Sequence, residues 1–391
     1  PSFGNLILSG IAFGLAQLSK YTAVYLYLLY IVFFLLIWFF SKRDYMMDYK
    51  VSRNLKKFLF NIVFIFLIGN FIVFCGYFFE FKPLLLNDVD VGEKIAFFEG
   101  FITKIFGSNS IWLKEKFTNF AINQPVPFST YIMGFLSASN QTFVEHRFPF
   151  MLFGNYSMTG WWYYYLVVFL LKTSFPILIL LIIAIVFARG LRKNKMCELF
   201  TTIPVILLMI LTMFSVLSGG VRYILPIYPF LFVYISKVIN VDIQVNRGFV
   251  QRRLAYILIL ILCFCHLFSS VRVFPHYLPY SNILAGGPSN GYKCLTWVNT
   301  DLGQELKGLA KYLDENDISR VKLCYGIFTP PETYNINYLP IEDIEKEIPE
   351  QEVYAISAPG INAFKWADKY KPRHMIGYTI FIYDFRFVNF M

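Results

Sequence analysis

Three basic residues stand at the ends of apolar segments in the sequence. Lys20 follows the first such segment, Lys172 lies just inside the fourth, and Arg222 begins the sixth. A lysine within an apolar span costs about 2.5 to 3.5 kcal/mol to insert, so Lys172 requires an interfacial position, an anionic partner, or both. If the three cations reach one membrane face, they could bind a lipid phosphate and stabilise the charge that develops when it leaves. We therefore predict a phosphate site formed by these residues and the Tyr223 hydroxyl.

A simpler explanation competes with the phosphate site. Each cation could extend separately to the lipid headgroups, as long basic side chains do near membrane interfaces. Tyr223 and the tyrosines of the run at 163–165 could equally belong to an interfacial aromatic belt. The sequence leaves both explanations open.

The composition indicates an integral membrane protein. Hydrophobic residues make up 57% of the 391 residues and charged residues only 15%, which is too apolar for a soluble domain of this length. The formal charge of +10 comes from basic residues in short loops between apolar segments. That pattern is typical of membrane orientation rather than of nucleic-acid binding, so we expect no nucleic-acid partner.

A window of about 20 residues marks seven apolar segments as membrane spans. Basic residues gather in the loops after the second, fourth and sixth segments, and such loops are normally cytoplasmic. The loop of residues 80–160 and the chain beyond residue 275 then lie outside, and the three cations share the outer face. The segments are Leu6–Leu18, Tyr21–Phe40, Phe58–Phe79, Tyr165–Phe187, Leu199–Leu217, Val221–Ser236 and Leu254–Phe274.

The predicted fold is a polytopic α-helical membrane region, residues 1–274, followed by an external α/β domain, residues 275–391. The external loop includes an amphipathic stretch, Glu93–Phe106. In the C-terminal domain we predict a helix at Leu302–Asn316 and strands at Val321–Tyr325, Val353–Ser357 and Tyr378–Tyr383. Because the sequence starts at Pro1 and is apolar from Leu6, we interpret it as a fragment of a longer protein.

The cysteines and histidines give no metal-ligand spacing and no carboxylate cluster suits Mg²⁺ or Mn²⁺, so the sequence supports no cofactor, and a requirement for a divalent metal stays open. Cys294 and Cys324 both fall in the external domain and could pair, although spacing alone does not show that their sulfurs meet. Asp301 and Glu305 are acidic residues of the external domain that could be taken for catalytic carboxylates. We instead expect them to cap and flank the helix that follows, because acidic residues favour helix starts.

Four motifs extend over nearly the whole sequence: GLAQLSKYTA (14–23), GNYSMTGWWYYYLVVFLLKTSFP (154–176), VRYILPIYPFLF (221–232), and HYLPYSNILAGGPSNGYKCL with NTDLGQELKGLAKYL (276–313). Together they resemble bacterial glycosyltransferases of family 39, relatives of protein O-mannosyltransferases and of the aminoarabinose transferase that modifies lipid A. The second and fourth motifs are the most specific. Many relatives read N-x-D-W-G-Q-D-L in the last one, so Leu302 and Glu305 loosen the match locally.

The resemblance implies a GT-C fold and a specific reaction. Such enzymes transfer a sugar from a polyprenyl-phosphate carrier to a protein or glycolipid acceptor at the outer face of a bacterial inner membrane, typically with inversion. The lipid phosphate is the leaving group, which suits a site of cations, and a carboxylate would deprotonate or orient the acceptor hydroxyl. In the family this carboxylate lies in the first external loop, which we expect upstream of this sequence. The catalytic base is therefore unknown.

Other residues are candidates for the substrate loop. Glu145 and His146 stand just before the aromatic run that Trp161 and Trp162 open, although both could be ordinary solvated loop residues. Asn155 stands where some relatives carry an acidic residue, which puts a charge-based role in doubt.

Two other classes of function remain open. A lipid-linked-sugar transporter or flippase would carry interrupted helices and polar residues near the bilayer midplane. Here the charged residues gather outside the spans, which favours chemistry at the surface. A noncatalytic membrane scaffold with an external partner-binding domain is the third interpretation, and an acidic residue in upstream sequence would argue against it.

Overall fold

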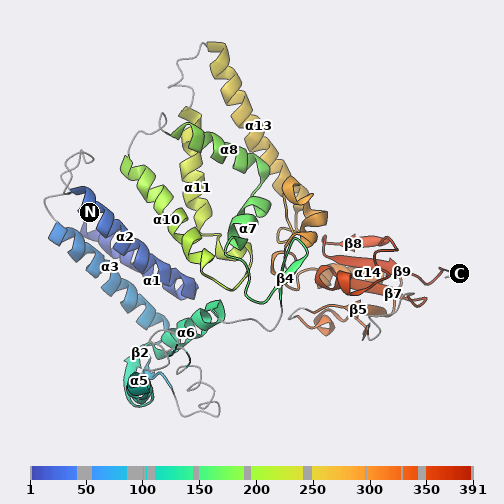
Figure 1. Ribbon diagram of the computed structural model, residues 1–391, viewed down its shortest axis with the longest axis horizontal. Helices are drawn as coiled ribbons and strands as arrows, with labels where there is room; N and C mark the ends of the chain where they lie inside the picture. Colours follow the sequence, from blue (N-terminus) through green and yellow to red (C-terminus); the bar gives the residue numbers. More distant parts are fainter. Residues whose placement is uncertain are drawn as a thin grey trace. The chain divides into compact units, whose positions relative to one another are not determined.

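The computed structural model describes residues 2–41, 55–85, 100, 103, 111–143, 149–188, 195–240, 249–295, 297–326, 329–341 and 349–388. It is mostly helical, at 62%, and ends in a sheet. The chain divides into two compact units, Pro1–Glu145 and His146–Met391 (Figure 1). This division falls at a different place from the predicted boundary at residue 274, which stays a prediction.

The first unit is built on three apolar helices, α1 (Phe3–Ser19), α2 (Tyr25–Ser41) and α3 (Leu55–Gly76), with the short helix η1 (Tyr21–Val24) between the first two. Glycines allow α1 and α3 to approach closely. A Cβ atom added at Gly14 would lie 2.6 Å from the Ile72 Cβ, and one at Gly69 would lie 2.4 Å from the Phe13 ring. Small residues let apolar helices pack at short range.

The remainder of the first unit is a small α/β arrangement. Strands β1 (Phe81–Pro83) and β2 (Pro125–Pro127) pair antiparallel, beside helices α5 (Ile111–Asn123) and α6 (Ser129–Phe143). Nearly all of the amphipathic stretch predicted at 93–106 lies outside the described residues.

The second unit begins with a hairpin and a broken helix. The hairpin is β3 (Phe150–Leu152) with β4 (Asn155–Ser157). Helix α7 (Tyr164–Lys172) is followed by α8 (Phe175–Val186) at an angle of 112°. Pro176 stands in the first turn of α8, where its missing N–H costs nothing.

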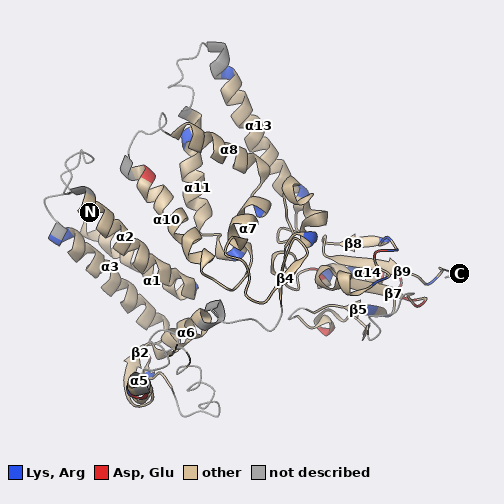
Figure 2. Cartoon of the chain, in the orientation of Figure 1, with Lys and Arg blue, Asp and Glu red and all other residues tan. Residues whose placement is uncertain are grey.

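Three further apolar helices accompany this broken pair: α10 (Lys195–Met213), α11 (Ile227–Ser236) and α13 (Phe249–Val273). Short 3₁₀ helices η3 (Val221–Tyr223) and η4 (Lys237–Asn240) flank α11. A buried cluster on α8, α11, η4 and α13, which includes Ile177, Leu180, Ile235, Val238 and Leu262, holds these helices together. Figure 2 shows that charged residues are sparse along the helices.

The predicted count of seven spans is not supported. Among the described residues, three helices are long and apolar enough to cross a membrane, at Tyr21–Phe39, Lys56–Gly76 and Arg253–Val273, and the bent pair α7–α8 makes up to four. Helices at Phe3–Ser19, Cys197–Met213 and Ile227–Ile239 are apolar but shorter. An apolar segment predicts a span only if its helix is continuous, and several of these segments are broken or short. The basic loops that set the predicted orientation lie mostly outside the described residues.

The C-terminal part of the second unit contains a five-stranded mixed sheet in the order β6-β5-β7-β9-β8. Its strands are β5 (Val321–Cys324), β6 (Tyr338–Pro340), β7 (Val353–Ser357), β8 (His374–Ile376) and β9 (Ile380–Asp384). Strand β7 pairs parallel with β5 and antiparallel with β9. The three predicted strands and the helix are confirmed as β5, β7, β9 and α14 (Leu306–Glu315), with shifts at the ends.

Every residue of β7 is buried, because the sheet is covered on both faces. Leu306, Leu309 and Leu313 of α14 pack in one core cluster, and a second cluster around Trp366 and Phe364 includes the η9 helix (Ala358–Ala363). Between α13 and this sheet the chain forms short 3₁₀ helices, η5 (Ile283–Ala285), η6 (Pro288–Lys293) and η7 (Trp297–Asn299), with η8 (Pro331–Tyr334) further on.

Candidate functional site

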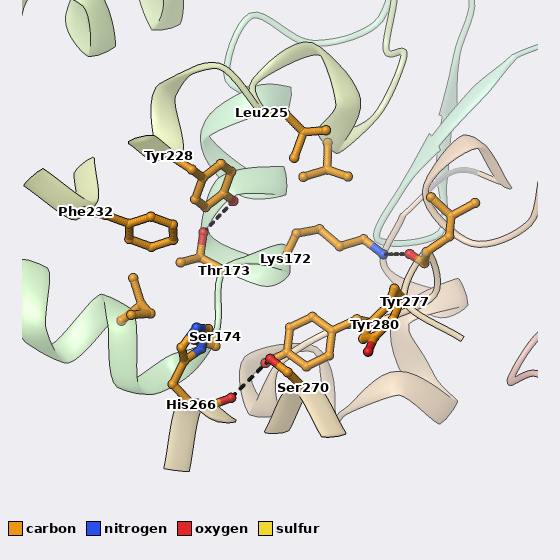
Figure 3. Close-up of a pocket in the computed structure, with 13 residues that line it drawn as sticks. Lys172, Thr173, Ser174, Leu225, Tyr228, Phe232, His266, Ser270, Tyr277 and Tyr280 are labelled. Atoms are coloured by element: carbon orange, nitrogen blue, oxygen red, sulfur yellow. Dashed lines mark hydrogen bonds between the residues drawn. The ribbon is translucent and has the colours of Figure 1, made fainter. Parts of the chain in front are cut away.

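The break between α7 and α8 is held by three side chains, each bonded to a different part of the second unit (Figure 3). The Lys172 ammonium donates to the backbone carbonyls of Leu278, at 2.9 Å, and Asn299, at 2.6 Å. The Thr173 hydroxyl lies 2.8 Å from the Tyr228 hydroxyl on α11. These side-chain bonds tie the break to other parts of the second unit.

Ser174 completes the set. Its hydroxyl lies 2.7 Å from Nδ1 of His266 on α13. The break is therefore joined to the α11 helix, the α13 helix and the segment that leads to the sheet.

A cavity of about 400 Å³ opens at this break. This volume is within the range of small-molecule sites. Apolar side chains form much of its wall, namely Ile177, Val221, Leu225, Phe232 and Leu278. Polar groups from several elements face the same space: Lys172, Thr173, Ser174, Tyr228, His266 and Ser270. A largely apolar wall with the Lys172 ammonium fixed in it suits a ligand that has both an anionic group and an apolar part.

The Lys172 ammonium has one N–H donor left for a ligand. Its side chain is only 8% exposed, and an ammonium group has three donors, of which the two carbonyls take two. Among the described residues, no carboxylate pairs with it. The buried charge therefore remains uncompensated by a counter-ion within this part of the chain, and burial of an unpaired charge is costly.

Asn299 organises the wall behind Lys172, a role that sequence reasoning missed. Its side-chain amide donates to the Tyr164 hydroxyl at 2.7 Å, and its Oδ1 accepts from the Val221 N–H at 3.1 Å. Gly220 lies against this amide with φ of +82°, so a Cβ there would be both strained and crowded. The available signal was the fourth motif, in which Asn299 precedes Thr300 and Asp301.

A second buried asparagine secures the same helix end. The Asn282 amide donates to the carbonyls of Leu170, at 2.6 Å, and Thr173, at 2.7 Å. Asn282 also accepts from the Leu284 N–H at the start of η5. Unlike Lys172, it is outside the set of residues that line the cavity.

The other predicted phosphate contacts are not among the residues lining this cavity. Arg222 is exposed, and its Nε donates to the Gly219 carbonyl at 3.1 Å. Tyr223 is half-buried, with its ring 6.3 Å from that of Tyr165. Lys20 is exposed at the end of α1 and belongs to the first unit, so its predicted meeting with Lys172 and Arg222 stays a prediction.

The candidate substrate-loop residues are dispersed. Glu145 and His146 lie outside the described residues. Asn155 is exposed in β4, and Trp162 is 65% exposed, whereas Trp161 is half-buried. None of the three described residues lines the cavity.

Asp301 and Glu305 flank the start of α14 as expected, but the Glu305 side chain does not cap the helix. Asp301 is fully buried and accepts from the Gly303 N–H at 2.9 Å and from the hydroxyls of Tyr325 and Thr379. Glu305 occupies the N-cap position of α14, but its side chain makes no capping bond and instead pairs with His276 Nδ1 at 2.8 Å. Asp301 thus combines a local N–H partner with two tertiary hydroxyls, whereas a tertiary partner takes the place of the capping bond at Glu305.

Cys294 and Cys324 are both free thiols in the structure. Burial raises the pKa of each, which favours the neutral thiol over the reactive thiolate. Among the described residues, no group of three or more His, Cys, Asp or Glu side chains could hold a metal ion.

Comparison with known proteins adds no relative. No protein-family model matches the chain, and no curated protein or solved structure matches it either.

Proposed function

We propose that this protein is a membrane glycosyltransferase that passes a sugar from a polyprenyl-phosphate carrier to a protein or glycolipid acceptor, at the outer face of a bacterial inner membrane. The observation that carries the proposal is the Lys172 ammonium in the wall of a largely apolar cavity at a break between apolar helices. The motif resemblance points to the same substrate class.

A lipid phosphate fits the chemistry of this cavity. Its anionic group would supply the counter-charge that Lys172 lacks among the described residues, through the third N–H of the ammonium. A second, almost wholly apolar hollow of about 290 Å³ lies among α7, α8, α10 and α11 and could receive part of a hydrocarbon chain. Phe169 of this hollow and Tyr228 of the first cavity have ring centroids 6.1 Å apart, so the two spaces are neighbours.

The remaining roles extend the proposal. From the sequence, Lys20, Arg222 and Tyr223 stay candidate contacts of the donor phosphate and Trp161 and Trp162 stay candidates for the substrate loop, although none of them lines this cavity. A carboxylate supplied from elsewhere in the protein would take the proton of the acceptor hydroxyl as the bond from the sugar to phosphate breaks. Cations near that phosphate would stabilise the departing charge.

The decisive experiment is transfer of radiolabelled sugar from a panel of polyprenyl-phosphate sugars by the natural full-length protein in liposomes. We expect transfer from at least one donor. Lys172→Met should reduce it by about tenfold or more, since a charge-assisted hydrogen bond contributes about 1.5 to 3 kcal/mol.

Asn282→Ala is the matched control for structural damage. It removes two hydrogen bonds to the same helix end, as Lys172→Met does at its own partners, but it removes no charge from the cavity. Equal losses in both variants would make Lys172 a structural tie only. Movement of lipid-linked sugar across the bilayer without transfer to any acceptor would favour the transporter.

A further inference from the structure

His266 also lines the cavity, and the phosphate contact proposed for Lys172 does not involve its imidazole ring. It lies on α13, lines the same cavity as Lys172, and is half-buried. Its Nδ1 is bonded to Ser174, and its Nε2 makes no hydrogen bond with any described residue. One ring nitrogen is thus fixed while the other remains available to a ligand.

Ser174 is arranged for this contact. It stands at the N-cap of α8, where a serine hydroxyl ordinarily accepts from a backbone N–H of the first turn. Here the hydroxyl makes no capping bond and meets the histidine instead. The helix lacks the stabilisation that a serine cap would provide. We interpret this loss as a sign that the bond which orients the His266 ring serves binding.

From this geometry we propose that His266 is a second hydrogen-bond donor, beside Lys172, to the phosphate ester of a membrane lipid, and that Ser174 is the positioning residue that holds its ring. The inference rests on the proposed function, because it assumes that the cavity receives the carrier phosphate. When the ring is protonated, Nε2–H donates to a phosphate oxygen and adds a positive charge to the site.

The affinity for phosphate should then depend on pH. The other titratable groups that line the cavity are Lys172 from α7, Tyr228 from α11, and Tyr277 and Tyr280 from the segment after α13. Histidine ordinarily changes charge between about pH 5 and pH 8, and a buried lysine without a counter-ion can lose its proton in the same range, so we assign to His266 only the part of the pH dependence that its substitution removes. A phosphodiester keeps one negative charge over that range, so a change in its affinity reports on the protein.

The test uses the full-length protein in nanodiscs and a defined probe, farnesyl methyl phosphate, with binding followed by thermophoresis. We expect binding to the unsubstituted protein to be about tenfold tighter near pH 6 than near pH 8, as one charged hydrogen bond is gained. His266→Asn keeps an amide where Nδ1 meets Ser174 and lacks Nε2. It should lose most of the gain in affinity that the unsubstituted protein shows between pH 8 and pH 6.

Two further variants separate positioning from folding. His266→Gln retains a neutral donor near Nε2, so its binding should be intermediate and should depend less on pH than that of the unsubstituted protein. Ser174→Ala should weaken binding near pH 6 while leaving a pH dependence. His374→Asn, at an exposed histidine outside the cavity, should match the unsubstituted protein.

Binding by His266→Asn that equals the unsubstituted protein at both pH values would overturn the proposal. If Lys172→Met loses binding and sugar transfer in that case, the proposed function stands and only the role of His266 fails. Inorganic phosphate that competes as well as the lipid ester would overturn the lipid source, and farnesol should not compete.

Discussion

At the scale of single residues, the buried carboxyl groups of Asp301 and Glu305 should make the stability of the C-terminal region depend on pH. Burial raises the pKa of Asp301 above its ordinary 3.8, against the donors that stabilise its charged form. Burial also raises the pKa of Glu305 above 4.5, although the hydrogen bond with His276 opposes this. Folding therefore favours the protonated forms of both groups.

The sign of the effect on stability follows from linkage. A carboxyl group whose folded pKa is raised stabilises the fold fully below its unfolded pKa, and this contribution is lost as the pH rises through the folded pKa. Local opening of α14 should thus become easier as the pH increases from about 4 toward neutrality. Hydrogen–deuterium exchange of the α14 amides, corrected for the intrinsic exchange rate at each pH, would measure this change in the free energy of local opening.

Glu305→Gln should reduce this dependence, because glutamine keeps the length of the side chain and cannot ionise. Glu315→Gln, an exposed change at the other end of the same helix, should leave it unchanged. An identical pH dependence in Glu305→Gln and the unsubstituted protein would show that the Glu305 carboxyl does not contribute.

From the sequence we predicted that Lys172 requires an interfacial position or an anionic partner, but we did not predict the groups that it contacts. Its need for an interface or an anion follows from an apolar setting that can be read locally. The carbonyls that it contacts belong to residues 106 and 127 positions further along the chain, and every residue type has a carbonyl. For the same reason the pairing of Ser174 with His266 left no sign in the local sequence, and the motif that contains Asn299 did not reveal its partners.

At the scale of elements, close packing of α1 on α3 depends on glycine. Gly14→Ala would place its methyl 2.6 Å from the Ile72 Cβ and 2.7 Å from the Gly69 carbonyl oxygen. We expect a loss of about 1 to 3 kcal/mol in unfolding free energy, because neither backbone nor a branched side chain yields easily. Thermal unfolding of the detergent-solubilised protein would detect it.

Gly4→Ala is the matched control on the same helix, where an added Cβ meets nothing within 4 Å. It should be neutral or stabilise by up to about 1 kcal/mol, since alanine favours helix. If both variants melt at the same temperature, the two helices do not pack in this way.

The sequence predicted the elements of the sheet better than the membrane helices. The strand expected at Val353–Ser357 has those same bounds, because the run is too short for a helix and contains β-branched and aromatic residues, which together favour a buried strand. The segment at 165–187 read as one span but is broken at Thr173 and Ser174. Hydropathy measures apolar content, not continuity, and only Pro176 marked the break.

At the scale of the whole molecule, the proposed orientation can be tested with thiols. Cys197 is exposed near the start of α10, in a loop region predicted to be cytoplasmic, and Ser319 is exposed beside β5 in the region predicted to lie outside. In the Ser319→Cys variant, a membrane-impermeant maleimide should label position 319 in intact cells and Cys197 only after permeabilisation. The opposite pattern would place the sheet in the cytoplasm.

The order of strands in the C-terminal sheet also bears on how the chain matures. Strand β7 lies between β5, made earlier, and β9, made later, so while β9 is still being synthesised the five residues of β7, all buried in the finished sheet, have an open edge. Unpaired strand edges invite association with other chains. We therefore expect the nascent domain to be most prone to association with other chains before Ile380–Asp384 has been synthesised.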